Sequence, residues 1–258
     1  MDLNRQCLVP QKITTLRRSN YPIIRNSLKN VELKRTAVFL LILAIALTSC
    51  EKEISKNVDQ AKIWTHYELS YSEAENKTHA TATFRFSNEN GTKLMLSNPS
   101  TVSLDGAELE WKSDNGYYQT EFNGLKATAS FNWVDLDGNS YINDIELRDV
   151  SFPNPVNNLF FQDSITSFMW AGLALDSNES VSLTIDGVGE TDRRIFSVDT
   201  IGATTVTFDS LALSQIDSGM VSMVLNKRHS PLLLEQTERG GLIIGRYQTD
   251  TVQVLLTD

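Results

Sequence analysis

Cysteine and histidine are scarce in this sequence of 258 residues. The two cysteines, Cys7 and Cys50, lie on either side of one hydrophobic run, which excludes a disulfide framework. The three histidines, His66, His79 and His229, do not have the spacing of zinc ligands. The motifs His-Glu-x-x-His and Gly-x-Ser-x-Gly are absent as well. The sequence therefore identifies no catalytic residue and predicts no cofactor.

Positive charge is scarce in most of the chain. The net charge is −9, but residues 1–49 alone hold eight basic and two acidic residues. This leaves 15 basic and 30 acidic residues, a net charge of −15, on residues 50–258. A surface of that sign repels phosphate backbones, so nucleic acid is not expected as a partner. The main basic cluster, Lys227-Arg228-His229, is interpreted as a solvated strand end.

The long hydrophobic run covers residues 37–47, directly after Lys34 and Arg35. It is too short for a membrane-spanning helix, which needs about 20 residues, and has the length of the apolar region of a signal peptide. Leu47-Thr48-Ser49-Cys50, which follows, resembles the lipobox of bacterial lipoproteins. The resemblance implies cleavage before Cys50 and covalent attachment of diacylglycerol and acyl lipid to this residue, which would anchor the protein to a membrane.

The lipobox divides the first part of the chain. Residues 1–49 form an N-terminal extension and signal peptide, and the polar residues 50–61 form a tether. The basic stretch before the hydrophobic run is long for a signal peptide, so we expect translation to start near Val31 or Leu33. The lipid places the protein in the cell envelope. Glu51, in place of Asp after the cysteine, favours the outer membrane and leaves the leaflet open.

Beyond the tether, the sequence predicts an all-β protein. Ala80–Phe86 alternates small or apolar with polar residues, the period of a half-buried strand. The dipeptides Asp105-Gly106, Asn123-Gly124 and Asp137-Gly138 suit hairpin turns between such segments, because both residues can adopt positive φ. No segment has a sustained helical period, and Leu211–Ile216 predicts a short helical turn.

Pro153 and Pro155 interrupt the series of predicted strands and mark the expected domain boundary. Each side holds six or seven short strands. This predicts two tandem immunoglobulin-like β-sandwich domains, residues 62–152 and 153–258, with one larger sandwich as the alternative. The Cys–Trp–Cys core of true immunoglobulin domains is absent, so the likeness concerns architecture only.

This arrangement resembles the two-domain β-sandwich lipoproteins of unknown function of Bacteroidetes-type bacteria. The resemblance rests on the lipobox, on Trp133–Asn143, and on Gln236–Gly241 before a final hairpin of Gly241–Tyr247 and Thr251–Leu256. It covers most of residues 50–258. It implies a location and an architecture, but no activity.

One loop contains a candidate calcium site. Asp135, Asp137, Asn139 and Glu146 match ligand positions 1, 3, 5 and 12 of an EF-hand loop, whose oxygen ligands suit Ca²⁺. Ser140, however, replaces the glycine that bends such a loop, and the flanking segments alternate like strands. We therefore favour a hairpin turn without a metal, and keep the calcium site as the alternative.

Aromatic residues provide a candidate glycan contact. Trp111, Tyr117 and Tyr118 lie on either side of a polar loop, and aromatic rings can stack on the apolar faces of sugars. The alternative is that these rings belong to the core, as most do in β-sandwiches. The wider set of candidate rings is Trp64, Tyr67, Trp111, Tyr117, Tyr118, Trp133 and Trp170.

Together these features predict a lipid-anchored cell-envelope protein that binds a protein or glycan partner without enzymatic activity. One alternative is a structural, pilus-like subunit that exchanges strands, for which the C-terminal segment Thr251–Thr257 is the candidate. The other is a glycan-acting enzyme, which requires two carboxylates facing each other across a cleft.

Overall fold

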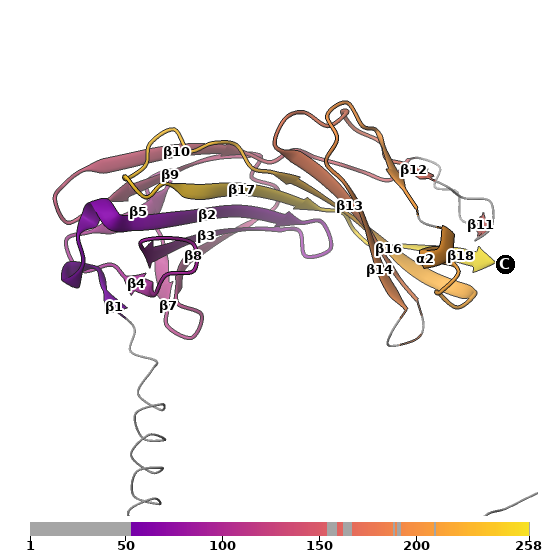
Figure 1. The fold of residues 1–258 in the computed structure, drawn as a ribbon, viewed down its shortest axis with the longest axis horizontal. Helices are drawn as coiled ribbons and strands as arrows, with labels where there is room; N and C mark the ends of the chain where they lie inside the picture. The colour runs from indigo at the N-terminus through magenta and orange to yellow at the C-terminus, as the bar shows by residue number, and fades with distance from the viewer. Residues whose placement is uncertain are drawn as a thin grey trace, which may run out of the picture. The chain divides into compact units, whose positions relative to one another are not determined.

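Figure 1 shows the fold of the chain in a computed structural model. The structure describes residues 53–153, 159–161, 167–187, 189, 192–208 and 210–257. These belong to one compact unit, Lys52–Asp258. The predicted signal peptide and Cys50 lie outside the described residues. None of the helices in the described part of the chain has the length and apolar content that a membrane span requires.

The described part of the chain consists mainly of β-strands, which confirms the all-β class. Its largest sheet has twelve strands, eight of which follow one path. In spatial order these eight are β1 (Glu53–Ile54), β4 (Lys93–Met95), β3 (Lys77–Phe86), β2 (Ile63–Ser72), β17 (Gly241–Gln248), β16 (Gly219–His229), β13 (Glu179–Asp186) and β14 (Arg193–Val198). The other four are β7 (Glu110–Lys112), β8 (Tyr117–Asn123), β11 (Leu159–Phe161) and β18 (Val252–Thr257).

Two smaller sheets complete the described structure. The four-stranded sheet has the order β10 (Ser140–Glu146), β9 (Thr128–Val134), β5 (Thr101–Leu104) and β6 (Ala107–Glu108). The two-stranded sheet consists of β12 (Ser167–Met169) and β15 (Thr205–Thr207). The helix α2 (Ser210–Leu213) lies where the sequence predicts a helical turn.

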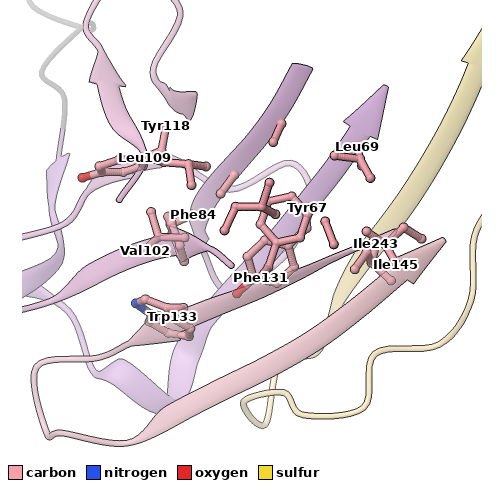
Figure 2. Close-up of a cluster of buried hydrophobic side chains, with 14 of the residues drawn as sticks. Tyr67, Leu69, Phe84, Val102, Leu109, Tyr118, Phe131, Trp133, Ile145 and Ile243 are labelled. Carbon is pink, nitrogen blue, oxygen red and sulfur yellow. The ribbon is translucent and has the colours of Figure 1, made fainter. Parts of the chain in front are cut away.

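The first hydrophobic core lies between the four-stranded sheet and the first strands of the large sheet (Figure 2). In β2, every second residue from Ile63 to Leu69 is buried, which is the alternation expected of a strand with one covered face. Tyr67 of the large sheet stacks on Phe131 of the smaller one at 4.9 Å between ring centroids. Burial of such side chains stabilises the sandwich by about 1.5–3 kcal/mol each.

Two of the predicted turns are confirmed. Asp105-Gly106 joins β5 to β6 with φ values of 47° and 85°, as a turn with two left-handed residues requires. The loop that contains Asp137-Gly138 joins β9 to β10, and its end residues Val134 and Ser140 are paired.

The predicted hairpin at Asn123-Gly124 is wrong. β8 pairs with β3 and β7 in the large sheet, whereas β9 pairs with β10 and β5 in the other. Thr78 holds the chain at this crossing, because its hydroxyl donates to the Gly124 carbonyl at 2.7 Å and accepts from Lys126 N at 3.0 Å. The dipeptide therefore carries the chain from one sheet to the other.

The expected tether at residues 50–61 is also folded over its described part. Glu53 and Ile54 form β1, which pairs with β4. Ser55 is fully buried, and its hydroxyl accepts from Ser97 N at 2.8 Å. The buried Gln60 side chain donates to the Ser55 carbonyl. Polar residues that satisfy backbone groups thus fix a segment whose composition is that of a linker.

The predicted final hairpin of β17 and β18 is wrong as well. Both strands run antiparallel to β16, one after the other: β17 pairs with its second half and β18 with its first. Between them, Thr249 is bonded to Leu225 twice, since Thr249 N donates to the Leu225 carbonyl and Thr249 Oγ1 accepts from Leu225 N, both at 3.0 Å. The chain therefore continues in one direction through an interruption in the strand.

β17 links the first and last parts of the chain. It pairs over its whole length with β2, in parallel, and Figure 1 shows this yellow strand beside the indigo one. Ile243 of β17 is fully buried in the first core, whose other buried members come from residues 63–147. A second core gathers residues between Val150 and Leu256. The first core thus includes a residue beyond the predicted boundary at residue 153, and the division into two domains stays a prediction.

A buried ion pair lies at the end of the second core. Lys227 Nζ is 3.2 Å from Glu179 Oε2, and the two side chains are 2% and 4% exposed. Glu179 also accepts from Asp176 N and lies 3.7 Å from Arg148 Nε. The interpretation of residues 227–229 as a solvated strand end is wrong for Lys227, because alternation along β16 turns this side chain inward.

Replacement of Lys227 by Met is expected to lower the free energy of unfolding by about 3–5 kcal/mol, because it leaves the Glu179 carboxylate buried without its closest cation. The double variant Lys227→Met/Glu179→Leu should lose less than the single variant, because no unpaired charge then remains. Urea denaturation measures both values. Lys56→Met, at an exposed position, is the control and should unfold like the parent. A single variant as stable as the parent would contradict the assignment.

Candidate functional site

The face of the large sheet that points away from the first core carries aromatic and charged side chains. In β2, Trp64, His66 and Glu68 occupy this face and are half-buried, between buried residues of the opposite face. Arg85 is placed likewise in β3. The rings of Trp64 and His66 lie 6.0 Å apart with a tilt of 56°. We call this region the Trp64 face.

Strand register gathers residues from distant parts of the chain on the Trp64 face. Trp64 pairs with Arg85 across the antiparallel strands β2 and β3. On the other side of β2, Arg246 of β17 occupies the same face, and it pairs with Arg228 of β16. Four adjacent strands therefore contribute two rings, Trp64 and His66, and three arginines to one surface.

Glu68 is the carboxylate that the structure places among these cations. Its Oε1 accepts a hydrogen bond from Arg246 Nε at 2.9 Å. Its Oε2 lies 3.9 Å from Nε2 of His66, which is shielded from water and makes no hydrogen bond. Glu68 thus neutralises part of the positive charge.

The pKa of His66 is below its ordinary value. Burial of the imidazole is the largest cause, and Glu68 opposes it by favouring the charged ring. The guanidinium groups of Arg246, Arg85 and Arg228 lower the pKa further. The imidazole is therefore neutral at pH 7, and its pKa depends on the positive charges around it.

A second candidate is a hollow of about 360 Å³ beside β7 and β8. Its lining residues are Glu108, Glu110, Lys112, Gln119, Thr120 and Glu121. Lys112 donates a 2.6 Å hydrogen bond to Glu110, and this bond holds the pKa of the Glu110 carboxyl below its ordinary value. A glycosidase acid needs a raised pKa, so Glu110 is unsuited to that role.

A third candidate is a hollow of about 440 Å³ at the buried ion pair. Its lining residues are Glu146, Leu147, Arg148, Asp149, Leu173, Ala174, Leu175, Asp176, Glu179 and Lys227. The charges that line it already pair with one another: Arg148 contacts Glu146 at 3.1 Å and Glu179 at 3.7 Å, and Lys227 contacts Glu179. We therefore assign this hollow a role in stabilising the fold.

The structure does not bring the four predicted calcium ligands together. Asp135 is buried and bonds its own loop: Oδ1 accepts from the backbone N–H groups of Asp137 and Asn139, and Oδ2 accepts from Asn139 Nδ2. Glu146 lies at the other end of β10 and contacts Arg148. In the described residues, no group of three or more His, Cys, Asp or Glu side chains is placed to hold a metal ion.

The three predicted glycan contacts do not share one exposed face. Tyr118 is buried, and its hydroxyl accepts from Leu96 N at 2.8 Å. Trp111 packs on Tyr118 at 4.9 Å and contacts the first core. Tyr117 points to the opposite side of β8, because successive side chains of a strand alternate. Tyr118 therefore belongs to the core, as the alternative interpretation expected, and Trp111 does so in part.

In the sequence, Trp64 is only one of many candidate rings, and no pattern identifies the Trp64 face. The alternation of Trp64, His66 and Glu68 is visible in the sequence and places them on one side of a strand. The pairing of β2 with β17, which brings Arg246 beside them, has no local signal. Long-range register alone assembles this site.

Comparisons with known proteins leave the family open. No protein-family model matches the chain, and no curated protein matches it. Among solved structures, one of a 1.5-MDa bacterial ice-binding adhesin is 13% identical, with a TM-score of 0.23 over 77% of this chain and 66% of that one. A mutant Salmonella alpha-2-macroglobulin is 14% identical, with a TM-score of 0.23 over 81% of this chain and 16% of that one.

Replacement of Glu68 by Gln is expected to lower the pKa of His66 further, because it removes the negative charge that favours the imidazolium. NMR titration of the imidazole ring protons measures the pKa. Asp217→Asn removes one charge from an exposed position between α2 and β16, outside this face, and should leave the pKa unchanged. An unchanged or raised pKa in Glu68→Gln would contradict the described geometry.

Proposed function

We propose that this chain is a lipid-anchored protein of the cell envelope that binds a glycan on the Trp64 face, without catalysing a reaction. The anchor follows from the lipobox and Cys50. The binding role rests on one observation: a half-buried tryptophan, a histidine and three arginines share the face of the large sheet that points away from the first core. A protein partner is the remaining possibility for the same surface.

A sheet face with these side chains suits binding better than catalysis. Tryptophan presents a large apolar surface at a low cost in conformational entropy, and a polar surround orients a ligand by hydrogen bonds. Catalysis by paired carboxylates would need two acids facing each other, one with a raised pKa. On the Trp64 face, Glu68 is engaged with Arg246. Glu121 of β8, further along the same face, lies 3.5 Å from Lys77 and 3.4 Å from His79.

Strand exchange receives no support from the C-terminal segment. Residues Leu255–Thr257 of β18 pair with β11 in parallel, and Gly219–Met223 of β16 pair with β18 on the other side. To act as a donor strand, β18 would have to break these pairings. A pilus-like subunit is therefore a weaker proposal than a binding module.

Anchoring is tested by Cys50→Ser. The variant should lack the lipid and move from the membrane fraction to the soluble fraction after cell lysis, because the thioether to diacylglycerol cannot form. Metabolic labelling with a fatty-acid analogue and fractionation measure the two effects. Ser49→Ala, which keeps a small residue before Cys50, is the matched control and should remain lipidated and membrane-bound. A Cys50→Ser protein that still carries the label would remove the lipobox assignment.

Glycan binding is tested with unlipidated residues 51–258 on a glycan array. Trp64→Ala should reduce binding by about tenfold or more, which corresponds to the loss of one aromatic stacking platform. The control is Trp111→Ala, on the other face of the sheet, with thermal unfolding recorded for both variants. If Trp64→Ala folds and binds as the parent does, the Trp64 face is not the glycan site. A blank array with the parent would redirect the proposal to a protein partner.

A further inference from the structure

Around Trp64 and Arg246, the Trp64 face carries more cations than carboxylates, on a chain that is strongly negative overall. Arg85, Arg228 and Arg246 lie on it, and Lys93 pairs in register with Arg85. Glu68 is the carboxylate described among them. Residues 50–258 as a whole carry 30 acidic residues against 15 basic ones. A local excess of cations on an acidic protein attracts an anion to this face in particular.

The charged groups on the face respond to this positive potential. Burial is the largest cause of the lowered pKa of Lys93, and the neighbouring Arg85 adds to it. The same arginine, with Arg246 and Arg228, lowers the pKa of His66.

The arginines retain hydrogen-bond donors. Arg85 donates from Nη1 to the Gly91 carbonyl at 3.0 Å, and Arg246 donates from Nε to Glu68. Within the described residues, the guanidinium of Arg228 makes no ion pair or hydrogen bond. Each guanidinium has five N–H donors, and a planar fork of two suits a carboxylate or a sulfate. Most of the N–H donors of these three arginines therefore have no acceptor among the described residues.

The spacing of the cations fits an extended ligand. Three inter-strand steps of about 4.8 Å separate β3, which carries Arg85, from β16, which carries Arg228. Arg85 lies opposite Trp64, whereas Arg246 and Arg228 lie level with Ser70, six residues or about 20 Å further along β2. One small anion cannot contact both ends. Trp64 and His66 lie on β2, between these two strands, and offer ring surfaces for stacking.

We infer that the Trp64 face binds an acidic polysaccharide, with a sugar ring on Trp64 and its carboxylate or sulfate groups on Arg85, Arg246 and Arg228. The inference rests on the proposed function, because it names the ligand class of the same surface. Uronic acids and sulfated sugars share the required chemistry, an anionic oxygen group on a pyranose. Nucleic acid fits less well, because its closely spaced phosphates would meet the negative charge of the surrounding surface.

Glu68 competes with the ligand for Arg246. While the carboxylate accepts from Nε, it neutralises part of the charge that a sugar carboxylate or sulfate would contact. Removal of this carboxylate should therefore strengthen binding, whereas loss of a neighbouring arginine should weaken it. Opposite effects from two adjacent residues are difficult to produce by a general loss of folding.

The experiment is affinity electrophoresis of unlipidated residues 51–258 in gels that contain polygalacturonate, dextran sulfate or neutral dextran. We expect retardation by one or both acidic polymers and none by neutral dextran. Arg85→Gln and Arg246→Gln should each weaken binding about fivefold or more, and Glu68→Gln should tighten it about two- to fivefold. The acidic polymer that retards the protein identifies carboxylate or sulfate as the bound group.

Arg193→Gln is the matched control, because it removes the same charge from the exposed start of β14. It should bind the acidic polymer as the parent does. An equal loss of binding in this variant would mean that only net charge matters and would overturn the inference. Equal, arginine-dependent binding of a single-stranded DNA oligomer would overturn the assignment to polysaccharide. Absence of retardation by both acidic polymers would overturn it too.

The results that would contradict the proposed function differ from those that would contradict the acidic ligand. Binding to a neutral glycan that is lost in Trp64→Ala but unchanged in Arg85→Gln would keep the glycan module and reject an acidic ligand. Binding of no glycan by the parent protein would reject both.

Discussion

The structure depends on the double pairing of β17. This strand joins β2 in parallel along its whole length and joins β16 in antiparallel at its end. Segments from the two ends of the folded chain thereby share one sheet. The start of β17 is held by Thr237, whose hydroxyl donates to the Ile63 carbonyl at 2.6 Å, and by Thr65 N, which donates to Gly240. Without β17, the first core would lose Ile243, and β2 would have an unpaired edge.

The far end of β17 is fixed by a single acidic residue, Glu73. Its carboxylate accepts from the Tyr247 hydroxyl at 2.6 Å and from Asp250 N at 2.8 Å, and its backbone N donates to Gln248. These bonds hold the chain where β17 ends and β18 begins. The same strand positions Arg246 beside Glu68, so the contacts that close the fold also assemble the Trp64 face. Stability and the proposed binding surface therefore have one structural origin.

Local sequence patterns predicted some turns correctly and others incorrectly, because they do not show which strands will pair. Asp105-Gly106 and Asn123-Gly124 both place glycine at positive φ, 85° and 80°. The first closes a hairpin, and the second moves the chain between sheets. The difference arises from Thr78, 46 residues away from Gly124 in sequence, which bonds the chain on both sides of the crossing. A dipeptide indicates that the backbone turns, but not which strand it will meet. The Asp135 loop shows the same limit of a local pattern, because the Asp135 carboxylate accepts hydrogen bonds from backbone N–H groups of its own loop.

The sequence by itself determined the all-β class, the alternation that puts Trp64, His66 and Glu68 on one side of a strand, and the hairpins at Asp105-Gly106 and Asp137-Gly138, because period and turn conformation depend on neighbouring residues. The lipobox at Cys50 is likewise a local pattern. Tertiary structure alone decided that β17 lies between β2 and β16, that Lys227 is buried against Glu179, and that Arg85, Arg228 and Arg246 share one sheet face. Those outcomes depend on register between segments that are not adjacent in sequence, up to 178 residues apart for Glu68 and Arg246, which only the packing of both cores selects.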